Sequence, residues 1–289
     1  MGDAARIVFG LVPPPSFAAA EPGVARVLRY VSERADVMMV RRHVDTYEAL
    51  ARALRHGEID VAWLPPIPFA RLSGDGLVHE LVCGERAGRE TFCAVLIARA
   101  DSKIGTRREL VGKRVAWVDP LSATGYVVPR LRLASHGIDP TTSFTKESFY
   151  GSHPAVVRAV LDRQADIGAT YAGFGDRGEL VRGSFLDVGA SADDLLVVDA
   201  YGDIPPDVVA VRAAVDPQVA LRVAKALLEA DGDALDAIRA VFGVVRFVQE
   251  PLTGYDTLRA EVEHGVDSGV IPAAAAFLST RPPPPGELT

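Results

Sequence analysis

The sequence predicts an α/β protein of two similar lobes, each a mainly parallel sheet flanked by helices. Short apolar runs rich in β-branched residues alternate with longer segments whose apolar residues have helical spacing. The chain also repeats itself: TYEALARALRHGEIDVAW places Tyr47 where SHPAVVRAVLDRQADIGAT places His153, a difference of 106 in residue number. The same offset relates further pairs: Ala49 and Ala155, Arg52 and Arg158, Ala53 and Ala159, Asp60 and Asp166, Val12 and Val118, Pro14 and Pro120, Ser16 and Ser122. We therefore expect two structurally equivalent halves.

The elements follow in α/β order. The short apolar runs predict strands buried on both faces at residues 7–12, 37–40, 61–64 and 114–118. Helical periodicity predicts helices at residues 23–34, 47–56, 126–136 and 154–163. A helix between successive strands is typical of a crossover connection in a parallel sheet.

Two further β-rich segments, FCAVLIAR at 92–99 and VVAVR at 208–212, bracket the second copy of the repeat. We expect a discontinuous first lobe of residues 1–97 and 207–289, and a second lobe of residues 98–206. Helical patterns at 220–230, 234–242 and 255–264 are expected to return to the first lobe and cover its sheet. Two chain crossings between lobes predict a hinge. The last residues, RPPPPGELT at 281–289, predict a disordered tail.

Composition excludes several classes of function. The 289 residues include 38 acidic and 31 scattered basic residues, a net charge of −7, which argues against a nucleic-acid partner. No apolar run is long enough to insert in a membrane. The six histidines show no spacing typical of a metal site, and nothing indicates a cofactor. Cys83 and Cys93 are expected to be buried thiols, with one disulfide possible between them. We expect a monomer.

The start of the sequence bears on location. No basic region with an apolar stretch precedes the first predicted strand. The sequence as it stands is typical of a cytoplasmic protein. If a leader peptide has been removed, we expect a periplasmic or cell-surface location.

The segment DPLSATGY, at 119–126, combines a strand end, a polar loop and a helix that begins near Gly125. Ser122 and Thr124 then lie at a helix N-terminus, where backbone N–H groups lack acceptors. An ordinary N-cap is the simpler interpretation of one hydroxyl residue. Two hydroxyls together with Gly125 favour a site for an anion, without Lys or Arg.

The segment YGSH, at 150–153, occupies the corresponding place before the next predicted helix. His153 is either a helix-cap histidine or a donor to the same anion, with a charge that responds near neutral pH. The repeat puts Tyr47 at the matching position in the first lobe. Both side chains are expected at carboxyl ends of strands, where open α/β sheets bind ligands.

Four motifs in this order resemble the phosphonate-, phosphite- and phosphate-binding components of ABC importers. The motifs are SATGYVVP (122–129), GSH (151–153), YEALARALRHGEIDVAWLPP (47–66) and IPPDVVAVR (204–212). The resemblance implies a two-lobed fold of the type II periplasmic-binding-protein kind, a small anionic ligand and an ABC permease as partner. It also implies ligand-binding residues: Tyr47, Phe92, Ser122, Ala123, Thr124, Gly125, His153 and Asp207.

Some positions depart from the family's pattern. Ala123 stands where a hydroxyl residue is common, and Phe92 lacks the hydroxyl of the usual aromatic residue. Gly173 lies near the position of an acidic residue in binders of amine-bearing phosphonates, which argues against an aminoalkylphosphonate.

Asp207 would repel an anion unless a proton lies between them, so a ligand with an acidic O–H is favoured over sulfate.

Two motifs that would indicate other functions are incomplete in this sequence. GFGDRG, at 173–178, has the glycine spacing of a dinucleotide site, but the following residues are poor as a crossover helix. No G-x-S-x-G elbow surrounds Ser122, which argues against a hydrolytic triad. Two alternatives stay open beside a binding protein without catalytic residues. One is a cytosolic enzyme on the same scaffold, acting on a small carboxylate through His153 and Asp207. The other is a ligand-sensing accessory module.

Overall fold

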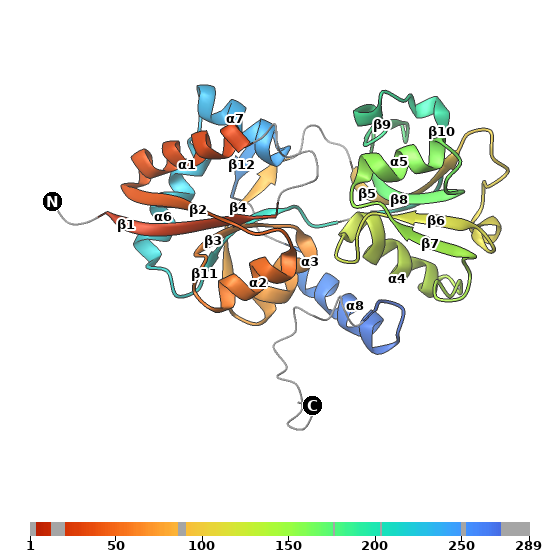
Figure 1. Ribbon diagram of the computed structural model, residues 1–289, viewed down its shortest axis with the longest axis horizontal. Helices are drawn as coiled ribbons and strands as arrows, with labels where there is room; N and C mark the ends of the chain where they lie inside the picture. The colour runs from red at the N-terminus through yellow and green to blue at the C-terminus, as the bar shows by residue number, and fades with distance from the viewer. Residues whose placement is uncertain are drawn as a thin grey trace.

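The structure is a computed structural model that describes residues 4–12, 21–85, 91–175, 177–202, 204–249 and 253–272. Two lobes lie side by side along the long axis, each a sheet with helices on both faces (Figure 1). The predicted α/β class is confirmed, but the expectation of mainly parallel sheets is wrong. Both sheets are mixed, because the strands next to the crossings between the lobes, β5 (Thr91–Arg99) and β11 (Val208–Arg212), pair antiparallel with their neighbours. The predicted helices are present with ends that differ by a few residues. None of the helices in these ranges has the length and apolar character of a membrane span.

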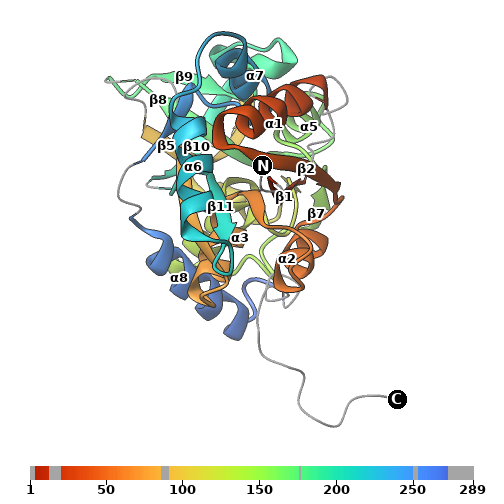
Figure 2. The ribbon, with the colours of Figure 1, turned by 90° about the vertical axis from the view of Figure 1, so that its left-hand side faces the viewer.

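The sheet of lobe I has the strand order β12-β4-β11-β3-β1-β2. Its strands are β1 (Ala5–Leu11), β2 (Val37–His43), β3 (Val61–Leu64), β4 (Val78–Glu85), β11 (Val208–Arg212) and β12 (Arg246–Val248). β1 pairs in parallel with β2 and β3, whereas β11 is antiparallel to β3 and β4. The helices of this lobe are α1 (Glu21–Ala35), α2 (Tyr47–Arg55), α3 (Pro66–Gly74), α6 (Pro217–Leu228) and α7 (Gly232–Phe242). α1 and α2 lie on opposite sides of β1 and β2 (Figure 2).

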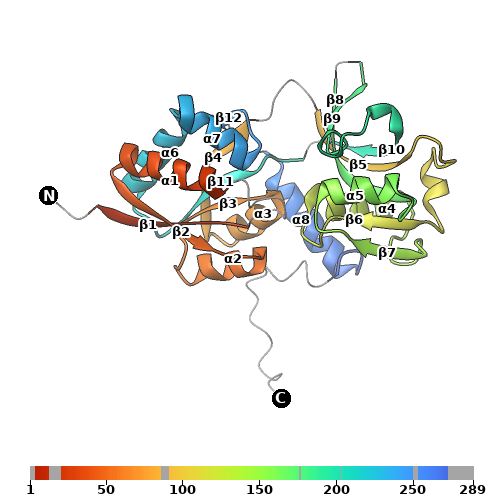
Figure 3. The same ribbon diagram turned by 45° about the horizontal axis from the view of Figure 1, so that its top comes forward.

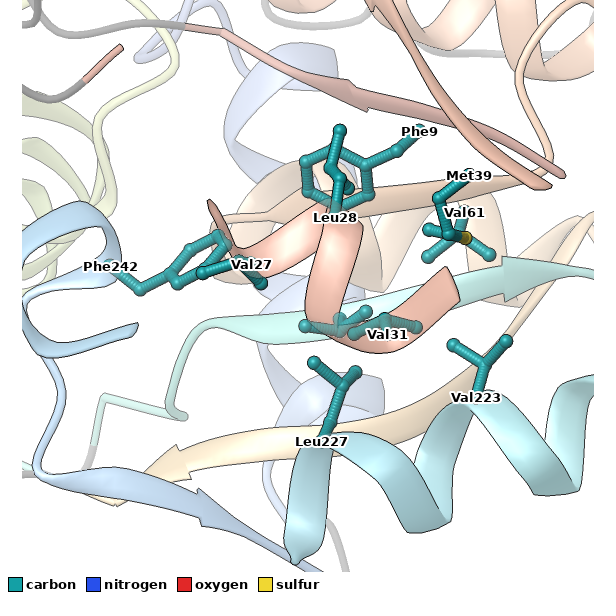
Figure 4. Close-up of a pocket in the computed structure, with 10 residues that line it drawn as sticks. Phe9, Val27, Leu28, Val31, Met39, Val61, Val223, Leu227 and Phe242 are labelled. Atoms are coloured by element: carbon teal, nitrogen blue, oxygen red, sulfur yellow. The ribbon is translucent and has the colours of Figure 1, made fainter. Parts of the chain in front are cut away.

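The core of lobe I is closely packed. Side chains of α1, α6 and α7 share one apolar cluster with the sheet, and those of α2 and α3 share another. In the first cluster Leu28, Val31, Val223 and Leu227 surround a cavity of about 10 Å³ (Figure 4). That volume is at the limit for a single water, so this cavity is a packing defect and not a ligand site.

The sheet of lobe II has the order β10-β5-β8-β6-β7, with β9 beside β8. Its strands are β5 (Thr91–Arg99), β6 (Arg114–Trp117), β7 (Lys146–Phe149), β8 (Ile167–Phe174), β9 (Leu180–Gly183) and β10 (Leu195–Tyr201). The helices are α4 (Val128–Ser135) and α5 (His153–Leu161). The predicted lobe division at 97/98 falls inside β5, which already pairs with β8 from Thr91 onward.

The internal repeat is confirmed in the hydrogen-bonding register of the two sheets. Each lobe contains the same parallel strand triplet, and the paired residues differ by 106 in number: Phe9–Val61 and Val115–Ile167, Gly10–Ala62 and Ala116–Gly168, Val8–Val40 and Arg114–Lys146. The repeated aspartates also have the same role. Asp60 accepts a hydrogen bond from the Val8 N–H at 3.0 Å, and Asp166 accepts one from the Arg114 N–H at 2.9 Å.

Helix α8 (Tyr255–Asp267) does not simply cover the sheet of lobe I, as its helical pattern predicted. In Figure 1 it lies below the place where the two lobes meet, and in Figure 3 it runs between α3 and lobe II. Leu258 and Val262 belong to the apolar cluster of lobe II, while the same helix packs against α3 of lobe I. Arg132 of α4 forms an ion pair with Glu261 at 2.9 Å. The amphipathic pattern predicted the helix, but it did not identify the surface that the helix covers.

Candidate functional site

The predicted hydroxyl segment begins a helix at the carboxyl end of β6. Ser122 is the N-cap residue, and its Oγ accepts a hydrogen bond from the Gly125 N–H at 3.0 Å. The next turn, Ala123–Val127, is a π-helix that continues into α4, so the helix begins at Ala123, slightly before the predicted start. Single π-turns of this kind are frequent at functional sites.

Several donors in this turn have no acceptor within the helix. The Ser122 Oγ accepts from Gly125, so the hydroxyl proton remains available to another acceptor. Thr124 is 6% exposed, and within the described ranges its hydroxyl makes no hydrogen bond. The first N–H groups of a helix, here those of Ala123 and Thr124, also lack intrahelical acceptors. Together these groups can surround the oxygens of an anion without any cationic side chain.

Gly125 is required by the close packing of this turn. A Cβ atom at this position would lie 2.3 Å from Cγ2 of Val118 and 2.8 Å from Oγ of Ser122. Both distances are far below van der Waals contact. The absence of a side chain therefore lets the helix start approach the end of β6 and keeps the Ser122 hydrogen bond in place.

His153 is the first residue of α5, which follows the carboxyl end of β7. Its Nδ1 lies 3.0 Å from Oγ1 of Thr170, and its ring meets Tyr171 edge to face with centroids 5.0 Å apart. Burial lowers the pKa of His153 to about 4, so the imidazole is neutral at neutral pH. The expectation that its charge responds near neutral pH is therefore wrong, because the ring is held in a poorly hydrated environment.

Tyr47 occupies the equivalent position in lobe I, as the first residue of α2. The N-caps also correspond: Thr46 accepts from the Ala49 N–H, and Ser152 accepts from the Ala155 N–H. The ring of Tyr47 packs against apolar clusters of both lobes, so it lies where the lobes meet. Burial raises the pKa of Tyr47, and the nearby carboxylates of Asp119 and Asp207 raise it further. Its hydroxyl therefore stays protonated and can donate a hydrogen bond.

Asp207 lies on the second crossing between the lobes, directly before β11. Its carbonyl accepts a hydrogen bond from the Gly84 N–H at 3.1 Å. The carbonyl of the preceding residue, Pro206, accepts a hydrogen bond from the Tyr255 hydroxyl. Both peptide groups around Asp207 are thus anchored. Because Asp207 and Asp119 both act electrostatically on Tyr47, the structure brings residues from both lobes and the crossing together.

Sequence reasoning gave no role to Asp119, Thr170 or Ser184. Asp119 follows β6, and its Oδ1 accepts a hydrogen bond from the Leu121 N–H at 2.8 Å. Burial raises the pKa of Asp119. Thr170 lies beneath His153 and contacts Ser184. The available signals were an acidic residue at a strand end and a hydroxyl inside the apolar strand 167–174.

The remaining predictions fall outside this group or outside the described residues. Phe92 pairs with Gly173 across β5 and β8, but its side chain lies outside the described part of the chain. Pro14, Ser16 and the tail at 281–289 also lie outside it. Gly173 places no acidic group opposite Phe92. After β8 the chain turns into the antiparallel strand β9, so no crossover helix of a dinucleotide site follows GFGDRG.

Other polar groupings in the described ranges do not compete with this site. No group of His, Cys, Asp and Glu side chains there is arranged to hold a metal ion. Cys83 and Cys93 are buried in the apolar clusters of different lobes. A surface hollow of about 490 Å³ lies between β2 and α2, where Arg42 and Glu58 form an ion pair at 2.6 Å.

Comparison with known proteins identifies the family and the fold of this chain. Residues 9–250 match the family model of the periplasmic substrate-binding protein of phosphonate ABC transporters. The protein XAC2383 of Xanthomonas citri, in a chloride-bound structure, superposes with a TM-score of 0.76 at 22% identity, over 91% of this chain and 99% of that one. PhnD1 of Prochlorococcus marinus, in complex with methylphosphonate, superposes with a TM-score of 0.70 at 16% identity, over 92% and 99% of the two chains.

A binding-protein component of an ABC phosphonate transporter from Pseudomonas aeruginosa gives a TM-score of 0.72 at 18% identity, over 93% and 89% of the chains. These likenesses confirm the type II periplasmic-binding-protein-like fold, with two mixed sheets flanked by helices. The family model covers most of the chain. This protein therefore belongs to the family of phosphonate-type substrate-binding proteins of ABC transporters.

Proposed function

We propose that this protein binds a small phosphorus oxyanion, namely phosphite, phosphate or an alkylphosphonate, between its lobes and delivers it to an ABC permease. The observation that carries the proposal is the helix start at Ser122–Gly125, with its unused hydroxyl and N–H donors. Neutral donors of this kind are preorganised for an oxyanion and need no counter-charge. In the related PhnD1 protein the bound ligand is methylphosphonate.

The acidic residues of the site support a ligand that carries a proton. Asp119 and Asp207 both act electrostatically on Tyr47, which is itself a proposed ligand residue, so the proposal brings two carboxyl groups close to the anion. A carboxylate next to an oxyanion is tolerated only where a proton is shared between their oxygens. Monoprotonated phosphate, phosphite and alkylphosphonates each carry a protonated oxygen, which can face a carboxylate, and an unprotonated oxygen, which can accept from the N–H and O–H donors. Sulfate supplies no proton near neutral pH, and the proposed site therefore discriminates against it.

The remaining ligand residues are proposed on the same grounds. The hydroxyls of Ser122 and Thr124 and the N–H groups of Ala123 and Thr124 would hold the oxygens from lobe II, together with His153, and Gly125 would let the ligand approach this turn closely. Tyr47 and Asp207 would close over the ligand from lobe I and the crossing, and Phe92 is proposed from the family resemblance alone. Gly173 leaves no acidic partner for a ligand amine, so a 2-aminoethyl substituent should bring no gain in affinity.

Binding can be tested by isothermal calorimetry and thermal unfolding with phosphate, phosphite, methylphosphonate, 2-aminoethylphosphonate and sulfate. We expect at least one of the first three to raise the melting temperature, and sulfate to have no effect. If none of the phosphorus compounds binds, the proposed function is wrong. Equal affinity for sulfate would exclude the role given to the carboxyl groups.

The donor role of Thr124 can be tested with a matched pair of variants. Thr124→Val removes one hydroxyl from the proposed site and keeps the side-chain shape. A hydrogen bond to a charged group contributes about 1.5–3 kcal/mol, so affinity should fall by roughly 10- to 100-fold. Thr145→Val is the control, because the Thr145 hydroxyl donates to the exposed Gly112 carbonyl at 3.3 Å, elsewhere in lobe II. The Thr145→Val variant should bind the oxyanion with the affinity of the wild type.

A further inference from the structure

Behind His153, two buried hydroxyl groups form a short hydrogen-bonded chain. The Nδ1 atom of His153 lies 3.0 Å from Oγ1 of Thr170, and that oxygen lies 2.9 Å from Oγ of Ser184. Thr170 is 3% exposed and Ser184 is fully buried. The three residues come from the start of α5, the middle of β8 and the residue after β9. The chain therefore joins the predicted ligand residue to the interior of lobe II.

The protons of these groups can be arranged in three ways that make both hydrogen bonds. In the first, Ser184 donates to Thr170, and Thr170 donates to Nδ1 of His153, which is then unprotonated. In the second, Nδ1–H donates to Thr170, and Thr170 donates to Ser184. In the third, Nδ1–H and Ser184 both donate to Thr170, whose own proton points elsewhere. The second arrangement leaves the Ser184 proton without an acceptor in this chain, and the third leaves the Thr170 proton without one. Within the described residues, the Ser184 hydroxyl has no hydrogen-bond partner besides Thr170, and the Thr170 hydroxyl has none besides His153 and Ser184.

A buried donor without an acceptor is disfavoured, by about tenfold or more in population. We propose that Thr170, supported by Ser184, holds His153 as the Nε2–H tautomer, so that the imidazole offers the ligand a donor and no acceptor. The neutral state of the ring, which a pKa of about 4 ensures at neutral pH, is required for a defined tautomer. The edge-to-face contact with Tyr171 fixes the plane of the same ring.

This tautomer gives His153 a part in specificity, an inference that rests on the proposed function. An Nε2–H group requires an oxygen with a free lone pair and opposes an O–H or N–H that points toward it. His153 would therefore accept a deprotonated oxygen of the ligand, and the protonated oxygen would have to lie toward the carboxyl groups. Thr170 acts as a positioning residue, because it determines what His153 presents and touches no ligand itself.

The tautomer can be measured directly in ligand-free protein labelled with ¹⁵N-histidine. Long-range ¹H–¹⁵N correlation spectra distinguish a protonated from an unprotonated ring nitrogen, and His153→Asn identifies the His153 signals by their loss. We expect Nε2 to be protonated and Nδ1 to be unprotonated. A dominant Nδ1–H form in the wild-type protein would overturn the proposal.

Variants of the two hydroxyl residues make the test specific. Thr170→Val should give a mixture of tautomers, whereas Thr170→Ser should restore the Nε2–H form. Ser184→Ala should keep the Nε2–H form, because the Thr170 proton then has Nδ1 as its remaining acceptor. If Thr170→Val keeps the wild-type tautomer and circular dichroism shows that the protein stays folded, Thr170 does not determine the tautomer of His153.

Ligand binding adds an independent readout. With the oxyanion that binds most tightly in calorimetry, Thr170→Val should lose about five- to tenfold in affinity, and Thr170→Ser should lose less than twofold. The absence of any binding oxyanion would refute the proposed function but leave the tautomer result standing. A correct tautomer with unchanged affinity in Thr170→Val would refute only the role in specificity.

Discussion

The hydroxyl of Tyr255 donates a hydrogen bond to the carbonyl of Pro206, which directly precedes Asp207. The Tyr255 ring also packs edge to face on Phe69, with centroids 4.8 Å apart. Tyr255 is the first residue of α8, so this helix holds the peptide that presents Asp207.

We predict that Tyr255→Phe weakens oxyanion binding, because it removes the hydrogen bond and keeps the ring. The expected loss is about 1 kcal/mol, or roughly fivefold in Kd by calorimetry. Tyr30→Phe is the matched control, since Tyr30 donates to the Glu229 carbonyl at 3.2 Å within lobe I. Equal affinities of the two variants would show that Tyr255 does not position Asp207.

Gly125→Ala should abolish binding and destabilise the fold. The added methyl group overlaps Val118 and the Ser122 oxygen, so the helix start has to shift. We expect a loss of about 1–3 kcal/mol in unfolding free energy, the usual cost of overpacking. Gly105→Ala serves as the control, because the nearest atom to its Cβ is 3.9 Å away, on Leu196. Urea unfolding and calorimetry of both variants check this prediction, and normal binding by Gly125→Ala would contradict it.

His153 should make the protein less stable in mild acid. Its pKa is about 4 in the folded protein, against an ordinary value of 6.5, so between these values the unfolded chain binds more protons. The contribution to stability is fully present above pH 6.5 and is lost as the pH falls toward 4. Between about pH 7.5 and about pH 5, the wild type should lose about 2 kcal/mol more than His153→Asn. Urea unfolding at both pH values measures this difference, and parallel losses would contradict it.

Arg163→Gly should stabilise the protein. Arg163 has a φ of 62°, the left-handed conformation that the equivalent residue of lobe I, Gly57, adopts with a φ of 71°. Glycine removes a strain of about 1 kcal/mol. The side chain contributes little in return, because its contact with Asp101 at 3.3 Å is an exposed ion pair. Thermal unfolding should show a higher melting temperature, and a lower one would mean that this contact outweighs the strain.

Much of the fold could be predicted from the sequence, because each strand and helix has its own pattern within a short segment and the repeat relates these segments in the two lobes. The register that pairs Phe9 with Val61 recurs at Val115 and Ile167, as the offset indicates. The environment of His153 was not predictable in this way. Its pKa depends on burial by residues that are distant in the chain, and Thr170 reaches it only through the folding of β8.

The position of α8 also could not be predicted from the sequence. Its pattern shows which face is apolar, but the two available partners, α3 and α4, lie in different lobes. The hydrogen bond from Tyr255 to Pro206 depends on that choice.

The same helix has a mechanical consequence. Since α8 packs on both lobes, a rotation that opens them must pull it away from one of them and wet side chains such as Leu258 and Val262. Each Å² of apolar surface exposed costs roughly 25 cal/mol. If the lobes move as we propose, this helix would resist their opening even without a ligand, and ligand binding would have to supply less of the free energy of closure.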